Sequence, residues 1–133
     1  MKIKKLPAFS LAELLVVLAI IGIMVALAIP IFTPLITKAK TTEAQIQLKH
    51  IYNMQTQHQY LKSSYSMEFK KIKFESPKTI KTGGTANYQY EIIEASTNSF
   101  KARAEAVVDF DGDGQFNVWE IDENGIPNEI IED

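Results

Sequence analysis

Hydrophobic residues are concentrated near the start of this chain, where an apolar run without any charge extends from Leu14 to Thr37. These 24 uncharged residues exceed the roughly 20 that a helix needs to cross the hydrocarbon core of a membrane. The next stretch, to about Leu61, contains no Gly or Pro and repeats apolar residues among Gln and Lys at helical spacing. The pattern therefore predicts one long N-terminal helix that spans a membrane in its first half.

Three later segments have the short apolar or alternating pattern of β-strands and are separated by turn residues. They are Tyr88–Ile93, Phe100–Val108 and Phe116–Ile121. Before them, Pro77 and Gly83 mark a loop region of roughly 25 residues. Aromatic and apolar side chains in its first part indicate that this part packs on the rest or forms a short strand. The order predicts an α+β fold, in which the long helix packs against a small antiparallel β-meander.

Composition narrows the chemistry of this 133-residue chain. It has no cysteine, which excludes disulfides, thiolate metal sites and a cysteine nucleophile. The polar part, from about Lys38 onward, is near the lower size limit for a self-sufficient hydrophobic core. A bound metal ion would help to stabilise a domain of this size. From Glu105 to Asp133 there are ten acids and no Lys or Arg, which argues against nucleic acid as the main partner. No nucleophile motif, His-carboxylate triad or phosphate loop occurs, so we do not expect an enzyme.

Charged residues at the edge of the apolar run indicate its orientation. Lys2, Lys4 and Lys5 precede it and predict a single pass with a cytoplasmic N-terminus. Glu13 lies directly before the run and is the one acid in this region. An ordinary anchor has no use for a carboxylate at this place, so Glu13 is a functional candidate.

Two cleavage sites compete. A secretory signal peptidase would cut after Ala28 and release a soluble protein, whereas a cut after Ala8 would retain the anchor; an uncleaved anchor is the third alternative. Cutting the Ala8–Phe9 bond turns a neutral amide into an ammonium. Phe9 and Glu13 are four residues apart and share a helix face, so the new cation can pair with Glu13 of its own or of a neighbouring chain. Such a pair sets subunit register more than it adds stability.

The segment Ala8-Phe9-Ser10-Leu11-Ala12-Glu13 resembles the cleavage and methylation motif of type IV prepilins and the related pseudopilins. The leader, the cleavage residue, the Phe, the Glu, the apolar run, Gly22 and Pro30 follow the order and spacing of that family over about a quarter of the chain. Ala8 stands where the family usually has Gly. The resemblance implies that a prepilin peptidase cuts after Ala8 and methylates the Phe9 amine. It also implies that Glu13 guides assembly and that the helix is unwound between Gly22 and Pro30 in the filament.

The resemblance implies a domain organisation as well: a leader over 1–8, a transmembrane and filament-core helix over 9–36, its amphipathic continuation over 37–62, and a loop region with an antiparallel sheet over 63–133. A structural subunit of this kind starts in the lipid bilayer of the bacterial inner membrane. With an assembly platform and minor subunits, it then self-associates into a periplasmic or extracellular filament. A type IV pilus subunit is favoured; a major pseudopilin of type II secretion, acting in protein transport, is the alternative.

An acidic loop lies between the second and third predicted strands. It fits the D-x-D-x-D-G pattern with Glu at the twelfth place, which is typical of an EF-hand calcium loop. Calcium takes six to eight oxygen ligands. The candidates are Asp109, Asp111, Asp113, Gln115 through its carbonyl, Asn117 through water, and Glu120. The residues on both sides of the loop have strand patterns, whereas helices flank an EF-hand loop. An acidic turn without calcium is therefore the alternative. In a strand, Glu120 would point away from the loop. A membrane-anchored, calcium-dependent binding module is thus a further hypothesis.

Overall fold

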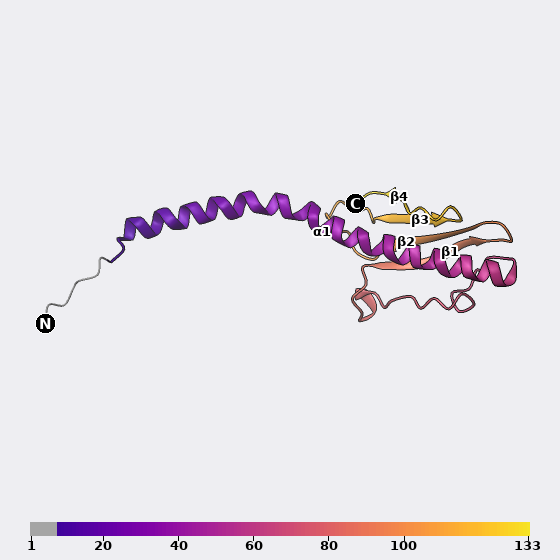
Figure 1. The fold of residues 1–133 in the computed structure, drawn as a ribbon. Coiled ribbons are helices and arrows are strands. Elements are labelled where there is room, and N and C mark those ends of the chain that lie inside the picture. Colours follow the sequence, from indigo (N-terminus) through magenta and orange to yellow (C-terminus); the bar gives the residue numbers. More distant parts are fainter. Residues whose placement is uncertain (1–7) are drawn as a thin grey trace. The chain divides into compact units, whose positions relative to one another are not determined.

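The long helix predicted from the apolar run is present as α1, Leu11–Lys62 (Figure 1). The computed structural model describes residues 8–133, so the basic leader residues Lys2, Lys4 and Lys5 lie outside the described residues. The chain divides into two units, 1–35 and 36–133, and the division falls within α1.

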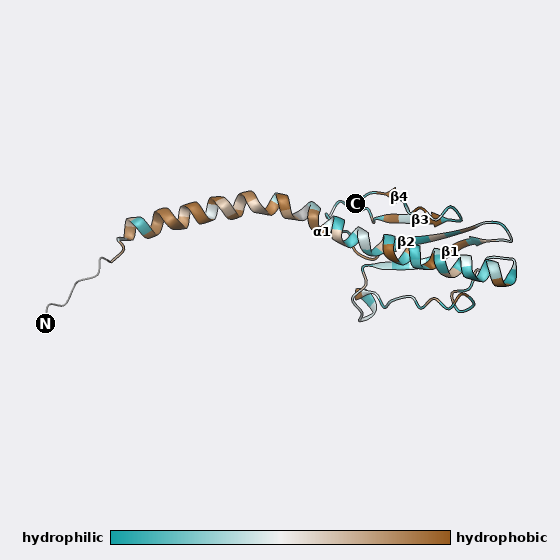
Figure 2. Cartoon of the chain, in the orientation of Figure 1, coloured by the Kyte–Doolittle hydropathy of each residue, from teal (hydrophilic) through white to brown (hydrophobic). Residues whose placement is uncertain are grey.

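In the first unit, α1 consists mainly of apolar residues, and its ribbon is coloured as hydrophobic over most of its length (Figure 2). From Leu11 to Phe32 every side chain except that of Ala28 is exposed. A helix that is apolar all round needs lipid or other protein around it, and this one is long and apolar enough to cross a membrane. Gly22 and Pro30 lie inside α1 without interrupting it. Unwinding between them in a filament therefore stays a prediction.

The second unit contains a four-stranded antiparallel sheet in the order β1-β2-β3-β4. The strands are β1 (Tyr88–Ala95), β2 (Phe100–Ala106), β3 (Val118–Asp122) and β4 (Asn128–Ile131). The predicted α+β fold and three-stranded meander are confirmed. The fourth strand was not predicted from the sequence because β4 has only four residues and no alternation. It lies at the sheet edge, and all four of its side chains are exposed.

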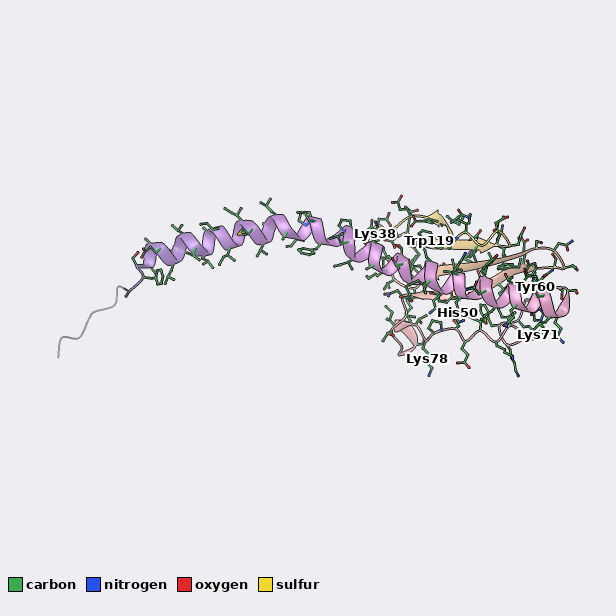
Figure 3. The ribbon with its side chains drawn as sticks, in the orientation of Figure 1. Lys38, His50, Tyr60, Lys71, Lys78 and Trp119 are labelled. Atoms are coloured by element: carbon green, nitrogen blue, oxygen red, sulfur yellow. The ribbon has the colours of Figure 1, made fainter. Side chains whose placement is uncertain are left out.

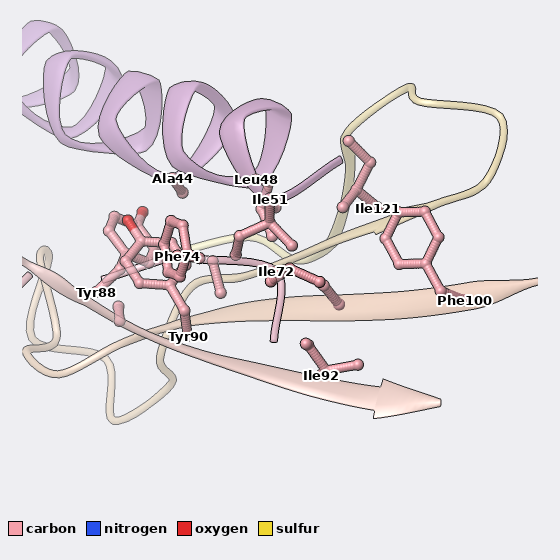
Figure 4. Close-up of a cluster of buried hydrophobic side chains, with 13 residues drawn as sticks. Ala44, Leu48, Ile51, Ile72, Phe74, Tyr88, Tyr90, Ile92, Phe100 and Ile121 are labelled. Carbon is pink, nitrogen blue, oxygen red and sulfur yellow. The ribbon is translucent and has the colours of Figure 1, made fainter. Parts of the chain in front are cut away.

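The core of the second unit forms where α1 packs on the inner face of the sheet (Figure 4). Ala44, Leu48 and Ile51 are fully buried, and their spacing of three and four residues places them on one helix stripe. The strand side chains opposite are Tyr88, Tyr90, Ile92, Phe100, Ala102, Ala104, Ala106 and Ile121. Ile46, an apolar residue of the same stretch of the helix, is 62% exposed. Ile46 lies two residues from both Ala44 and Leu48, about 200° around the helix, and so points away from the sheet.

The segment between α1 and β1 is attached to the helix by a buried polar pair. Gln55 Nε2 donates to the Ser66 carbonyl oxygen at 2.6 Å, and the Ser66 N–H donates to Gln55 Oε1 at 2.9 Å. The rings of Phe69 and Phe74 then contact each other at a tilted angle, with centroids 5.0 Å apart. Of the two predicted alternatives for the first part of this segment, which the structure describes in full, packing on the rest of the unit is observed and a short strand is not. Its further structure is η1 (Ile80–Thr82) and an isolated bridge between Thr79 and Ala86.

Candidate functional site

The residues around the expected cleavage point form a closed hydrogen-bonded turn at the start of α1. Glu13 Oε2 accepts the Ser10 N–H at 2.7 Å and the Ser10 hydroxyl at 2.8 Å. The Glu13 N–H in return donates to Ser10 Oγ at 3.3 Å. This is a capping box, in which the first residue and the one three positions later satisfy each other's helix-end groups. The S-x-x-E spacing was visible in the sequence and could have revealed it.

The capping box places the Glu13 carboxylate beside the bond expected to be cut. Ala8 and Phe9 are exposed and precede the helix, and Phe9 keeps 80% of its surface exposed. Phe9, Glu13 and Val16 help line an open, apolar depression of about 380 Å³. An amine created at Phe9 would be covalently next to Ser10, whose N–H already contacts Glu13. The pairing of that amine with Glu13 stays a prediction, since the amine exists only after cleavage.

The acidic loop between β2 and β3 is organised around Asp109. Its carboxylate accepts the backbone N–H groups of Gly112 at 2.5 Å and Gly114 at 2.7 Å. Both glycines have positive φ, 86° and 91°, where side chains are disfavoured. The bonds from Gly114 and Gly112 hold the pKa of the Asp109 carboxyl below its ordinary value. These two bonds favour the ionised form of Asp109 and hold the backbone of the loop in a tight turn.

Two of the predicted calcium ligands come together with a residue that the loop pattern does not include. Asp109, Asp111 and Asp133 each offer a carboxylate oxygen, and the three oxygens lie within 4.8 Å of one another. Asp133 also accepts the N–H of Phe110 at 3.0 Å and that of Asp111 at 3.1 Å. Asp133 lies far along the sequence and reaches the loop only because β4 runs back along β3.

The remaining predicted ligands are placed differently. The Asp113 carboxylate accepts the Gln115 N–H at 2.7 Å, and both residues are exposed on the loop. Asn117 is fully buried: its Oδ1 accepts the Tyr88 hydroxyl at 2.7 Å, and its amide donates to Glu129 Oε1 at 2.6 Å. Asn117 is therefore committed to the interior.

Glu120 faces away from the loop. It lies in β3 opposite Arg103 of β2, on the outer face of the sheet, and its carboxylate accepts from Arg103 Nη2 at 2.7 Å and from Nε at 3.0 Å. The structure thus does not bring Asn117 or Glu120 to the loop carboxylates. Calcium binding itself stays a prediction, with the three clustered aspartates as its most suitable donors.

A long apolar N-terminal helix packed, in its second half, on a small antiparallel sheet defines an α+β, pilin-like protein. No family model matches the chain. Over 58 residues the chain is 43% identical to the Type IV major pilin protein PilA of Myxococcus xanthus (strain DK1622). This similarity confirms the resemblance to the type IV pilin family. The match covers 44% of this chain, which spans about a quarter, 26%, of the length of that curated relative.

Proposed function

We propose that this chain is a structural subunit of a helical filament of the type IV pilus type. The observation that carries the proposal is the exposed apolar surface of α1 over residues 11–32, with the capped Glu13 at its start. Such a surface requires lipid before assembly and neighbouring helices afterwards. The identity to a protein named a type IV major pilin supports the pilus over the alternative, a type II secretion pseudopilus. As a structural subunit, the chain would have no enzymatic role.

Processing is part of the proposal. A prepilin peptidase cuts between Ala8 and Phe9 and methylates the new amine, which then pairs with Glu13 of its own or a neighbouring chain. Before assembly the chain crosses the bacterial inner membrane once, with its N-terminus in the cytoplasm. An assembly platform and minor subunits then incorporate it through its N-terminal helix, with unwinding between Gly22 and Pro30.

We also propose a calcium ion at the acidic loop. Asp109, Asp111 and Asp133 would hold it, because three converging carboxylates supply the hard oxygen ligands that calcium prefers. When bound, the ion would neutralise the repulsion among these acids. It would thereby tie the end of the chain to the loop and tighten the sheet.

The mass of the mature N-terminal peptide, taken from membranes and sheared filaments of the producing cells, tests the function. The expected peptide begins at Phe9 and carries one added methyl group. A chain beginning at Ile29 would instead be a secreted soluble domain, and an intact Met1 would leave an unprocessed anchor. Either of these two results contradicts the proposed filament subunit.

A further inference from the structure

One end of the second unit carries a basic cluster that is only partly neutralised by the ion pairs of residues 8–133. The cluster consists of Lys62, Lys70, Lys71 and Lys73, at the end of α1 and in the segment that follows. Lys62, Lys71 and Lys73 line a cavity of about 280 Å³ together with His58 and the apolar side chain of Leu61. Lys71 pairs with Glu68 at 2.5 Å. Across residues 8–133, no ion pair engages the other three lysines.

The opposite end of the same unit is acidic. Its carboxylates are Asp109, Asp111 and Asp113 in the loop, with Glu132 and Asp133 at the end of β4. The loop lies beside the start of this unit's helix, because the Lys40 ammonium is 4.5 Å from the ring centroid of Phe110. Lys81 lies similarly over Phe116 at 5.6 Å. Two lysines beside five carboxylates leave this end of the unit with a net negative charge.

The two clusters are too far apart to neutralise each other. Lys40 and Lys62 mark the two ends of the helix in this unit, and 22 residues of α-helix rise about 33 Å. In Figure 3, Lys38 and Lys71 lie toward these opposite ends of the unit. At physiological ionic strength exposed charges are screened beyond about 8 Å. The two clusters of one copy therefore do not pair with each other, and each is free to meet opposite charge on a second molecule.

We propose that the basic end of one copy of this chain receives the acidic loop and β4 end of the next copy in the filament. This inference rests on the proposed function and assigns one of its contacts. Exposed apolar side chains lie at both ends: Tyr60, Leu61 and Met67 beside the lysines, and Phe116 and Ile131 beside the acids. An apolar centre within a charged rim is the usual arrangement of a protein interface.

The geometry of such a contact leads to a filament. Two different patches meet, so a pair of copies still has one free patch of each kind, and the contact repeats along an open filament when the rotation between copies does not close a ring. Asp113 and Glu132 lie outside the three proposed calcium ligands. The acidic end therefore stays negative when calcium is bound, and the two proposals are compatible.

Disulfide cross-linking tests the contact directly, because the natural chain has no cysteine. We would introduce Lys70→Cys and Asp113→Cys together in the full chain, both at exposed positions. Filaments from producing cells would be oxidised with copper phenanthroline and run on a non-reducing gel. The expected result is a ladder of covalent dimers, trimers and higher multimers that collapses on reduction. The matched control pairs Lys70→Cys with Gln89→Cys on the outer face of the sheet and should give no ladder beyond dimers.

The outcomes separate this contact from the function on which it rests. Filaments that are visible by electron microscopy but yield no ladder, or the same ladder as the control pair, overturn the contact and leave the filament subunit intact. Absence of filaments from the unsubstituted chain overturns both.

Charge reversal provides a second measurement. Lys70→Glu alone and Asp113→Lys alone should each lose most of the filaments, and the two together should restore them. A double variant no better than either single variant overturns the contact.

Discussion

Gln55 Nε2 lies 2.6 Å from the carbonyl oxygen of Ser66, and the Ser66 amide nitrogen lies 2.9 Å from Gln55 Oε1. Gln55 is fully buried, and Ser66 keeps only 6% of its surface exposed. A single side chain thus satisfies both backbone groups of a residue that water does not reach. The pair attaches the segment after α1 to the helix and sets the path on which Phe69 and Phe74 enter the core.

Replacing Gln55 with alanine should destabilise the second unit strongly. The substitution leaves the N–H and the carbonyl of Ser66 without partners in the interior, and we expect a loss of about 2–4 kcal/mol in the free energy of unfolding. Urea denaturation of a fragment covering residues 34–133 would measure it. Asn53→Ala, an exposed position on the same helix, is the matched control and should change stability by about 0.5 kcal/mol at most. Equal losses in the two variants would contradict the role of the buried pair.

The capping box separates two roles of Glu13. Glu13→Gln keeps a side-chain acceptor for Ser10 but removes the charge, whereas Glu13→Ala removes both. If the charge guides assembly through the Phe9 amine, both variants should fail to incorporate when coexpressed with the unsubstituted chain. Incorporation would be read from the composition of purified filaments.

The helix start gives a control for the same pair of variants. Amide hydrogen exchange in detergent micelles should be faster at Ser10 in Glu13→Ala than in Glu13→Gln, because only the alanine variant loses the side-chain oxygen that accepts the Ser10 N–H. Normal incorporation of Glu13→Gln would mean that the cap, and not the charge, matters for assembly.

Calcium should raise the melting temperature of the 34–133 fragment relative to the same protein in chelator, because the ion would relieve the repulsion among the clustered aspartates. Asp133→Asn should abolish this rise, since it removes one of three converging carboxylates. Glu120→Gln should lower the starting stability by disrupting the bonds to Arg103 but keep the rise. No rise at millimolar calcium contradicts the site. If Glu120→Gln abolished the rise and Asp133→Asn kept it, the ligands would be those of the twelve-residue EF-hand pattern, with Glu120 in place of Asp133.

Asp109 should make the stability of the fragment depend on pH. The hydrogen bonds from Gly114 and Gly112 lower the pKa of its carboxyl in the folded state. A lowered folded pKa means that the contribution is fully present above the unfolded value of about 3.9 and is lost as the pH falls through the folded value. In chelator, the unsubstituted fragment should be more stable than Asp109→Asn at pH 6, and this difference should shrink as the pH is lowered to 3. Glu94→Gln, which removes an exposed charge from β1, controls for net charge. A difference that is constant with pH would contradict the assignment.

The site residues follow from the sequence to different degrees. Phe9, Ser10 and Glu13 are neighbours in sequence, so their proximity is a local property that any helix beginning there would show. The calcium candidates depend on chain direction instead. Strand alternation turns Glu120 outward to Arg103, and the register of β3 with β4 brings Asp133 beside Asp109.

The sequence by itself determined the apolar helix, its capped start and the three strands whose patterns are regular, because each of these depends on residues close together in the chain. Only the tertiary structure decided which stripe of α1 is buried, where β4 pairs and which carboxylates converge. Those features depend on contacts between distant residues: Gln55 with Ser66, Asn117 with Tyr88, and Asp133 with the acidic loop. Local pattern carries no information about such pairings, since the energy that selects them arises only when the sheet and the helix pack together.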